Sequence, residues 1–153
     1  MPEQPGPRSA SVRKADVLAR LAAPVADCWV ATASSSPEPY LVPLTLAWFE
    51  ERIILATARR SPTARNLAAH GRARVGLGPT RDVVLIEAVL AETIPVGAAG
   101  AVGDAYASQN DWDPREAGDS YVFLALRPLR VQAWRELNEI PDRLLMADGV
   151  WLV

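Results

Sequence analysis

The chain has 153 residues, half of them hydrophobic and 22% charged, and its formal net charge is −2. This length favours one domain with a sizeable core. The sequence shows neither a basic stripe nor an acidic tail, so no nucleic-acid partner is expected, because such binding normally requires a clustered basic face.

The numbers of cysteines and histidines and the lengths of the hydrophobic runs exclude further classes of protein. The single Cys28 excludes an intrachain disulfide, and the single His70 excludes paired-histidine motifs, so we expect no metal site. Residues 1–13 are rich in proline and serine and lack the apolar stretch of a signal peptide, which predicts a flexible arm before a domain spanning 14–153. No apolar run approaches the roughly 20 residues that cross a bilayer. We therefore expect a cytoplasmic protein without membrane contact.

Hydrophobic periodicity and turn residues predict the elements in chain order. Three helices are expected at connections and six strands between them. The expected ranges are a helix at 14–23, strands at 28–33, 40–48 and 53–57, a helix from 62 to 70, strands at 73–78 and 82–93, a helix at 98–109 and a strand at 120–134. Many short strands with regular turn signals favour a mainly β fold, a closed or nearly closed six-stranded antiparallel barrel with connecting helices. Pro128 within the last strand indicates a bulge or an edge position.

The start of the second helix is the first candidate site. Ser61 is a good N-cap, and Pro62 suits the first helical position, where its missing N–H costs nothing. A helix N-terminus attracts phosphate, and Arg59, Arg60 and Arg65 can add charge-assisted contacts. The alternative is an ordinary capped surface helix with solvated arginines.

The strand before it is the second candidate. Pro43 cannot donate to a sheet ladder, which leaves main-chain groups at Val42 and Leu44 free to contact the polar edge of a heterocycle. The alternative is a bulged edge strand.

Further candidates are single residues. The hydroxyl of Thr57 can join a phosphate cluster, and Asp82 can accept from a heterocycle N–H or simply cap a turn. Trp134, with Arg143 further on, can close over a ring or form a dimer interface. No residue pattern indicates covalent or acid–base catalysis, so any hard chemistry belongs to a cofactor.

Together these segments resemble the pyridoxamine 5′-phosphate oxidase-like split β-barrel superfamily, which includes FMN enzymes and actinobacterial deazaflavin (F420) reductases. The resemblance covers about residues 14–152. It is carried by the segments 41–45, 56–58, 61–67, 72–75, 81–83 and 131–135.

The resemblance implies a homodimer with two cofactor sites at the subunit interface. Leu41, Val42, Pro43, Leu44 and Thr45 would lie along the ring of the cofactor. Thr57, Ser61, Thr63 and Arg65 would surround its phosphate, in a motif that also contains Pro62 and Asn66. Asp82 would lie near the ring, and Trp134 and Arg143 would come from the partner subunit.

Two departures from the family's sequence motifs restrict the expected cofactor and substrate. Pro62-Thr63 stands where family members that bind FMN tightly often carry Arg-Lys, which favours F420 slightly over FMN. The Arg- and His-containing substrate motif of true pyridoxamine phosphate oxidases is missing from the C-terminal part. We therefore expect an F420- or FMN-dependent oxidoreductase that transfers hydride to or from a small organic substrate. The alternatives are a non-catalytic flavin, F420 or haem-binding carrier or sensor, and a ligand-free structural dimer.

Overall fold

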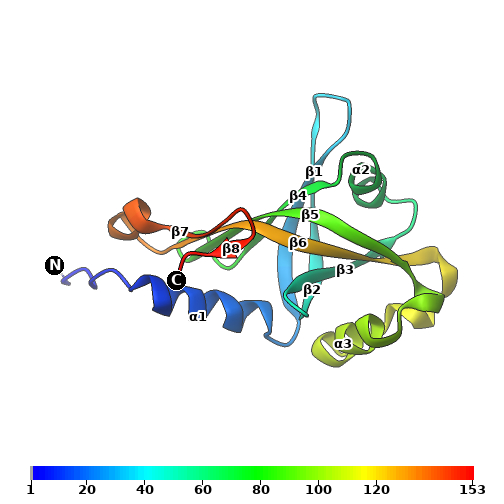
Figure 1. Ribbon diagram of the computed structural model, residues 1–153, viewed down its shortest axis with the longest axis horizontal. Coiled ribbons are helices and arrows are strands. Elements are labelled where there is room, and N and C mark those ends of the chain that lie inside the picture. Colours follow the sequence, from blue (N-terminus) through cyan, green and yellow to red (C-terminus); the bar gives the residue numbers. More distant parts are fainter. Residues whose placement is uncertain (1) are drawn as a thin grey trace.

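Six antiparallel strands close into a barrel. The computed structural model describes residues 2–153, and its sheet runs in the order β3-β2-β1-β4-β5-β6-β7-β8, with β6 also pairing with β3 (Figure 1). That extra pairing, from Ile53 opposite Leu126 to Ala58 opposite Tyr121, closes the barrel. The strands are β1 (Ala26–Ala33), β2 (Pro39–Phe49), β3 (Arg52–Ala58), β4 (Arg72–Leu77), β5 (Val83–Pro95), β6 (Tyr121–Trp134), β7 (Leu144–Ala147) and β8 (Val150–Trp151).

The six predicted strands and three predicted helices are present. The helices are α1 (Ala10–Leu21), α2 (Pro62–His70) and α3 (Gly100–Asn110), with 3₁₀ helices η1 (Val96–Ala98), η2 (Pro114–Ser120) and η3 (Leu137–Asp142). Helix α1 begins four residues earlier than expected, so residues 10–13 of the predicted arm are helical; the domain boundary itself stays a prediction. The short hairpin β7–β8 was not predicted. No helix among residues 2–153 is long and apolar enough to cross a bilayer.

Two prolines mark where strands lose a neighbour. Strand β2 pairs with β1 from Pro39 to Leu46, but its pairing with β3 begins only at Leu46, so Pro43 faces another strand on one side alone. On β6, the pairing with β3 ends at Leu126, and the register against β5 shifts beside Pro128. Both positions agree with the rule that proline occupies strand edges and bulges.

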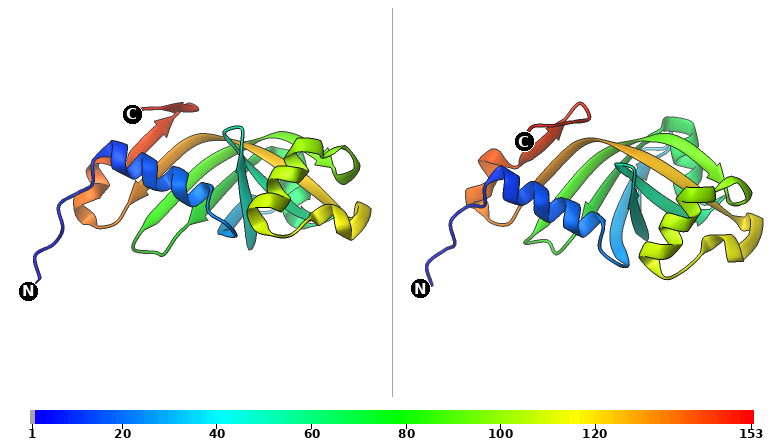
Figure 2. Two further views of the ribbon diagram at one scale, coloured as in Figure 1. Left: turned by 90° about the horizontal axis from the view of Figure 1, so that it is seen from below. Right: turned by 60° about the horizontal axis from the view of Figure 1, so that its bottom comes forward.

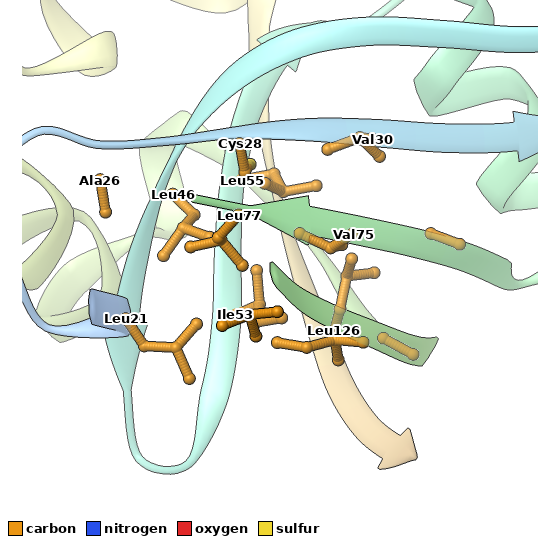
Figure 3. Close-up of a cluster of buried hydrophobic side chains, with 14 of the residues drawn as sticks. Leu21, Ala26, Cys28, Val30, Leu46, Ile53, Leu55, Val75, Leu77 and Leu126 are labelled. Atoms are coloured by element: carbon orange, nitrogen blue, oxygen red, sulfur yellow. The ribbon is translucent and has the colours of Figure 1, made fainter. Parts of the chain in front are cut away.

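The barrel interior is filled by alternating strand residues. Val30, Leu46, Ile53, Leu55 and Val75 are fully buried and point toward one another (Figure 3). Cys28 belongs to the same cluster, and burial raises the pKa of its thiol to about 12, with Asp27 nearby adding to the effect. Cys28 is therefore a packing residue, as a buried free cysteine usually is.

The helices cover the barrel on different sides. Helix α2 lies on the upper side of the strands in Figure 1, whereas α1 and α3 lie below them. Gln109 at the end of α3 connects this helix to α1 and β2 by hydrogen bonds. Its amide nitrogen donates to the carbonyls of Leu21 and Ala23, and its amide oxygen accepts from the N–H of Trp48.

The N- and C-terminal segments meet along α1. The helix runs beside the C-terminal hairpin (Figure 2), and Lys14 donates to the carbonyl of Val153 and lies 4.9 Å from the ring centroid of Trp151. Arg8, just before the helix, donates to both carboxylate oxygens of Glu139 in η3. Arg8, α1 and the C-terminal hairpin are thus packed together.

Candidate functional site

The start of α2 has the geometry that the sequence predicts. Ser61 is the N-cap, and its hydroxyl accepts from the N–H of Ala64 at 3.1 Å and from the hydroxyl of Thr57 at 3.2 Å. Pro62 occupies the first helical position, and Gly71 ends the helix with φ of 72°. Thr57 lies near the end of β3 and Ser61 caps α2, so the two hydroxyls meet at the connection between this strand and the helix.

Positive charge surrounds this helix start. Arg59, Arg60 and Arg65 are exposed, and within residues 2–153 none of them has a carboxylate within 4.0 Å. Three uncompensated guanidinium groups beside a helix N-terminus favour an anionic ligand such as phosphate.

Thr63 does not share this exposure. Its side chain is only 1% exposed, so the expected direct contact of Thr63 with a phosphate is not favoured in the single chain. Thr57 is buried as well, and its hydroxyl is engaged with Ser61. The groups available at the surface are Ser61 and the arginines.

Asn66 links α2 to the hairpin β1–β2. Its amide donates to the hydroxyl of Thr32 at 3.1 Å, and Thr32 lies opposite Tyr40 in the β1–β2 ladder. The middle of α2 therefore contacts β1 at the residue that lies opposite Tyr40 of β2.

The predicted ring contacts occupy the edge of β2. From Pro39 to Thr45 this strand has no β3 neighbour, which leaves main-chain groups of Leu41, Val42 and Leu44 without a second ladder. The carbonyl of Thr45 is an exception because it accepts from the hydroxyl of Tyr106 at 3.0 Å. The predicted free edge is thus present and ends at Thr45.

The outer face of β1, β2 and β4, which we call the open face, carries two hollows whose linings mix apolar and polar residues. Pro43, Trp29 and Gly76 lie side by side across the three strands, and they line a hollow of about 560 Å³ together with Asp27, Leu44 and Thr45. A second hollow of about 320 Å³ lies further along β1 and is lined by Ala31, Thr32, Arg72 and Arg74.

Large apolar side chains are exposed on and beside the open face. Trp29 is 55% exposed, Leu41 58% and Leu85, which lies opposite Gly76 on β5, 45%. Exposed apolar patches of this kind mark interaction or ligand sites. Trp29 is therefore not part of the core of the single chain. Trp29, Gly76 and the arginines of β4 were missed as site residues, although strand alternation places Trp29 opposite in direction to the buried Cys28 and Val30.

Asp82 belongs to a different neighbourhood. It forms ion pairs with Arg20 and Arg135, so in this chain it is a structural partner of arginines. Val83 lies opposite Trp134, whereas Ala58 lies opposite Tyr121 at the other end of β6. At about 3.3 Å per residue these ends are roughly 40 Å apart, so Asp82 and Ser61 do not meet within one chain.

Trp134 and Arg143 lie together, as their predicted shared role requires. The guanidinium carbon of Arg143 is 6.0 Å from the ring centroid of Trp134. Both residues are at the Asp82 end of β6. Their supply by a partner subunit stays a prediction.

Comparison with known proteins identifies the fold. Neither a protein-family model nor a curated protein sequence matches this chain. Among solved structures, an F420 reductase is similar with a TM-score of 0.62 and 16% identity, over 74% of this chain and 93% of that protein.

Two other structures show the range of the fold. A haem-binding protein from Mycobacterium smegmatis aligns with a TM-score of 0.66 and 17% identity, over 93% of this chain and 59% of that protein. A pyridoxamine 5′-phosphate oxidase-related, FMN-binding protein from Nostoc punctiforme aligns with a TM-score of 0.54 and 14% identity, over 88% and 84%. The protein therefore has the split β-barrel fold of pyridoxamine 5′-phosphate oxidase-like, F420- and FMN-binding proteins.

Proposed function

We propose that the protein is an F420- or FMN-dependent oxidoreductase that works as a homodimer on a small organic substrate. The observation that carries this proposal is the second hollow, which connects the open face with the part of β1 that contacts α2. It is lined by Ala31, which shares the outward direction of Trp29, and by Thr32, the hydrogen-bond partner of Asn66, which points to the other side of β1. A flat ring system on the open face would have its anionic tail within reach of Arg59, Arg60 and Arg65.

The residues present fit such a cofactor in part. Exposed apolar surface at Trp29 and Leu41 and the free main-chain edge of β2 suit a flat heterocycle, and the arginines suit a phosphate. The helix start itself offers little, because Pro62 has no N–H and Ser61 already caps Ala64. Binding of the anion would thus depend on side chains, which agrees with the missing Arg-Lys pair.

The cofactor would supply the hydride chemistry, and the protein would bind, orient and shield it. Asp27 is the carboxylate closest to Pro43 in the larger hollow, and it accepts from the hydroxyl of Thr45 at 2.8 Å. This contact would hold the carboxylate in place beside the ring.

A non-catalytic carrier or sensor is the second candidate. It is supported by the similarity of the fold to that of a haem-binding protein from Mycobacterium smegmatis. Steady oxidation of reduced F420 or NAD(P)H with an added acceptor would support the enzyme. Tight stoichiometric binding of F420, FMN or haem without turnover would support the carrier or sensor.

The binding test uses Arg65. The absorbance spectrum of purified protein, followed by titration with F420 and FMN, measures affinity. Replacing Arg65 with Ala should weaken binding by about 1–3 kcal/mol, the scale of hydrogen bonds to charged groups.

Arg127→Ala is the matched control, since Arg127 is an exposed arginine on β6 that lines neither hollow of the open face. It should leave affinity unchanged. Equal affinities for all three proteins would remove Arg65 from the site, and a protein that binds neither cofactor would refute the function.

A further inference from the structure

Another hollow, lined by Arg8, Arg13, Glu139 and Asp142 among others, lies at the far end of β6 from Ser61. It has a volume of about 530 Å³ and is formed by residues 7–10 and Arg13 on one side and by η3 with Leu144 on the other. Its walls include Ser9, Ala10, Arg13 and Asn138. The open face and α2 contribute nothing to it.

Arg13 is the unusual residue of this hollow. It is only 2% exposed, yet within residues 2–153 it has no carboxylate within 4.0 Å. Its Nε donates to the carbonyl of Arg8, and its Nη1 donates to the carbonyls of Ala133 and Asp142. No acceptor among these residues contacts its Nη2. An arginine stays charged in proteins, and a buried charge normally has a partner of opposite sign.

The neighbouring carboxylates are already engaged. Glu139 accepts from the main chain and side chain of Arg8 and from the N–H of Arg135. Asp16 pairs with Arg8 and Arg135, and Asp82 pairs with Arg20 and Arg135. Asp142 also lines the hollow, so four carboxylates lie near Arg8, Arg13, Arg20 and Arg135, but none of them lies within 4.0 Å of Arg13.

The start of α1 adds further donors. Ser9 is the N-cap, and its hydroxyl accepts from the N–H of Val12. The N–H groups of Ala10 and Ser11 have no acceptor among residues 2–153. They lie at the positive end of the helix dipole, where anions bind favourably.

We propose that this hollow binds a compact oxyanion, a carboxylate or phosphate, which is the missing counter-ion of Arg13. The anion would accept from Nη2 of Arg13 and from the N–H groups at the start of α1. This site is separate from the proposed cofactor site, and each can fail without the other.

The test is a titration followed by ¹H–¹⁵N NMR at constant ionic strength, with inorganic phosphate in one series and acetate in the other. The Nε–H of Arg13 and the N–H groups of Ala10 and Ser11 should shift and saturate together. A response to phosphate alone identifies a phosphate site, and a response to acetate alone a carboxylate site. No saturable shift in either series would overturn the proposal.

Two charge variants make the test specific. Asn138→Asp places a carboxylate in the hollow with almost no change of shape, so it should weaken anion binding about tenfold by supplying a counter-ion. Ser35→Asp adds the same charge on an exposed loop and should leave binding unchanged. Equal weakening by both would mean that the response is only long-range electrostatics and would refute the site.

The variant Arg65→Ala distinguishes anion binding at Arg13 from anion binding near Ser61. Phosphate can also bind near Ser61, but that binding would not shift the resonances of Arg13. The shifts at Arg13 should therefore be the same in Arg65→Ala as in the natural protein. Their loss would assign the response to α2 and overturn the proposal.

Discussion

Single residues decide most of the electrostatics of this protein. Glu139 is buried and accepts several hydrogen bonds from Arg8, which hold its pKa well below the ordinary value of 4.5, at about 2. Burial by itself would raise the pKa of Glu139, but this effect is smaller than that of the hydrogen bonds from Arg8. The pair joins residue 8 to η3, so the N-terminal segment is attached to the C-terminal part through one carboxylate.

Glu139 gives the folded state a specific pH dependence. The unfolded chain takes up a proton at Glu139 near pH 4.5, whereas the folded chain does so only near pH 2. The stabilisation is therefore complete above pH 4.5 and is lost as the pH falls toward 2. In Glu139→Gln, the deficit in unfolding free energy should be largest near neutral pH and should shrink across this window.

Urea unfolding at a series of pH values measures this deficit. Glu38→Gln, a change in the exposed β1–β2 loop, is the control and should leave the unfolding free energy nearly unchanged. A deficit for Glu139→Gln that is independent of pH would show that Glu139 does not carry this titration.

At the scale of elements, α2 was the most predictable part of the chain. An N-cap serine, a proline at the next position and a closing glycine define both ends locally, so its bounds follow from the sequence. The hairpin β7–β8 could not be predicted in this way, because its strands have four and two residues and depend on pairing, β7 with β6 and β8 with β7. Local signals identify long elements, but short strands depend on neighbours.

The two serine N-caps of the α-helices allow a matched comparison. Ser61→Ala and Ser9→Ala each remove a hydroxyl that accepts from a main-chain N–H, so each should lower the unfolding free energy by about 1 kcal/mol. Only Ser61→Ala should also weaken F420 or FMN binding. Chemical unfolding and cofactor titration of both variants check this, and equal cofactor affinities would argue against Ser61 as a ligand contact.

At the scale of the whole molecule, the barrel was predictable and the grouping of site residues was not. Regular strand and turn signals implied six antiparallel strands, and the structure closes them through β3 and β6. The position of Asp82 could not be read locally, because its partners Arg20 and Arg135 lie 62 and 53 residues away. Whether Trp134 and Arg143 meet the open face depends on a second subunit.

The proposed homodimer predicts a specific effect at Leu41. The open face should be covered by the partner, so Leu41→Glu would bury a charge in the interface and should convert a dimer to a monomer. Val12→Glu changes a similarly exposed apolar residue on α1 and should leave the dimer intact. Analytical ultracentrifugation distinguishes the outcomes. A natural protein that sediments as a monomer would contradict the dimer, and dissociation of both variants would contradict the assignment of this face.

Closure of the barrel through β3 and β6 also constrains how the protein is made. Ile53 pairs with Leu126, so during translation β3 is finished long before its partner leaves the ribosome. Until then the nascent chain carries an unpaired β3 edge and an open set of apolar strands, because pairings between distant segments form late. The barrel can close only after synthesis has passed β6, which makes the last fifth of the polypeptide essential for completing a core that the first half begins.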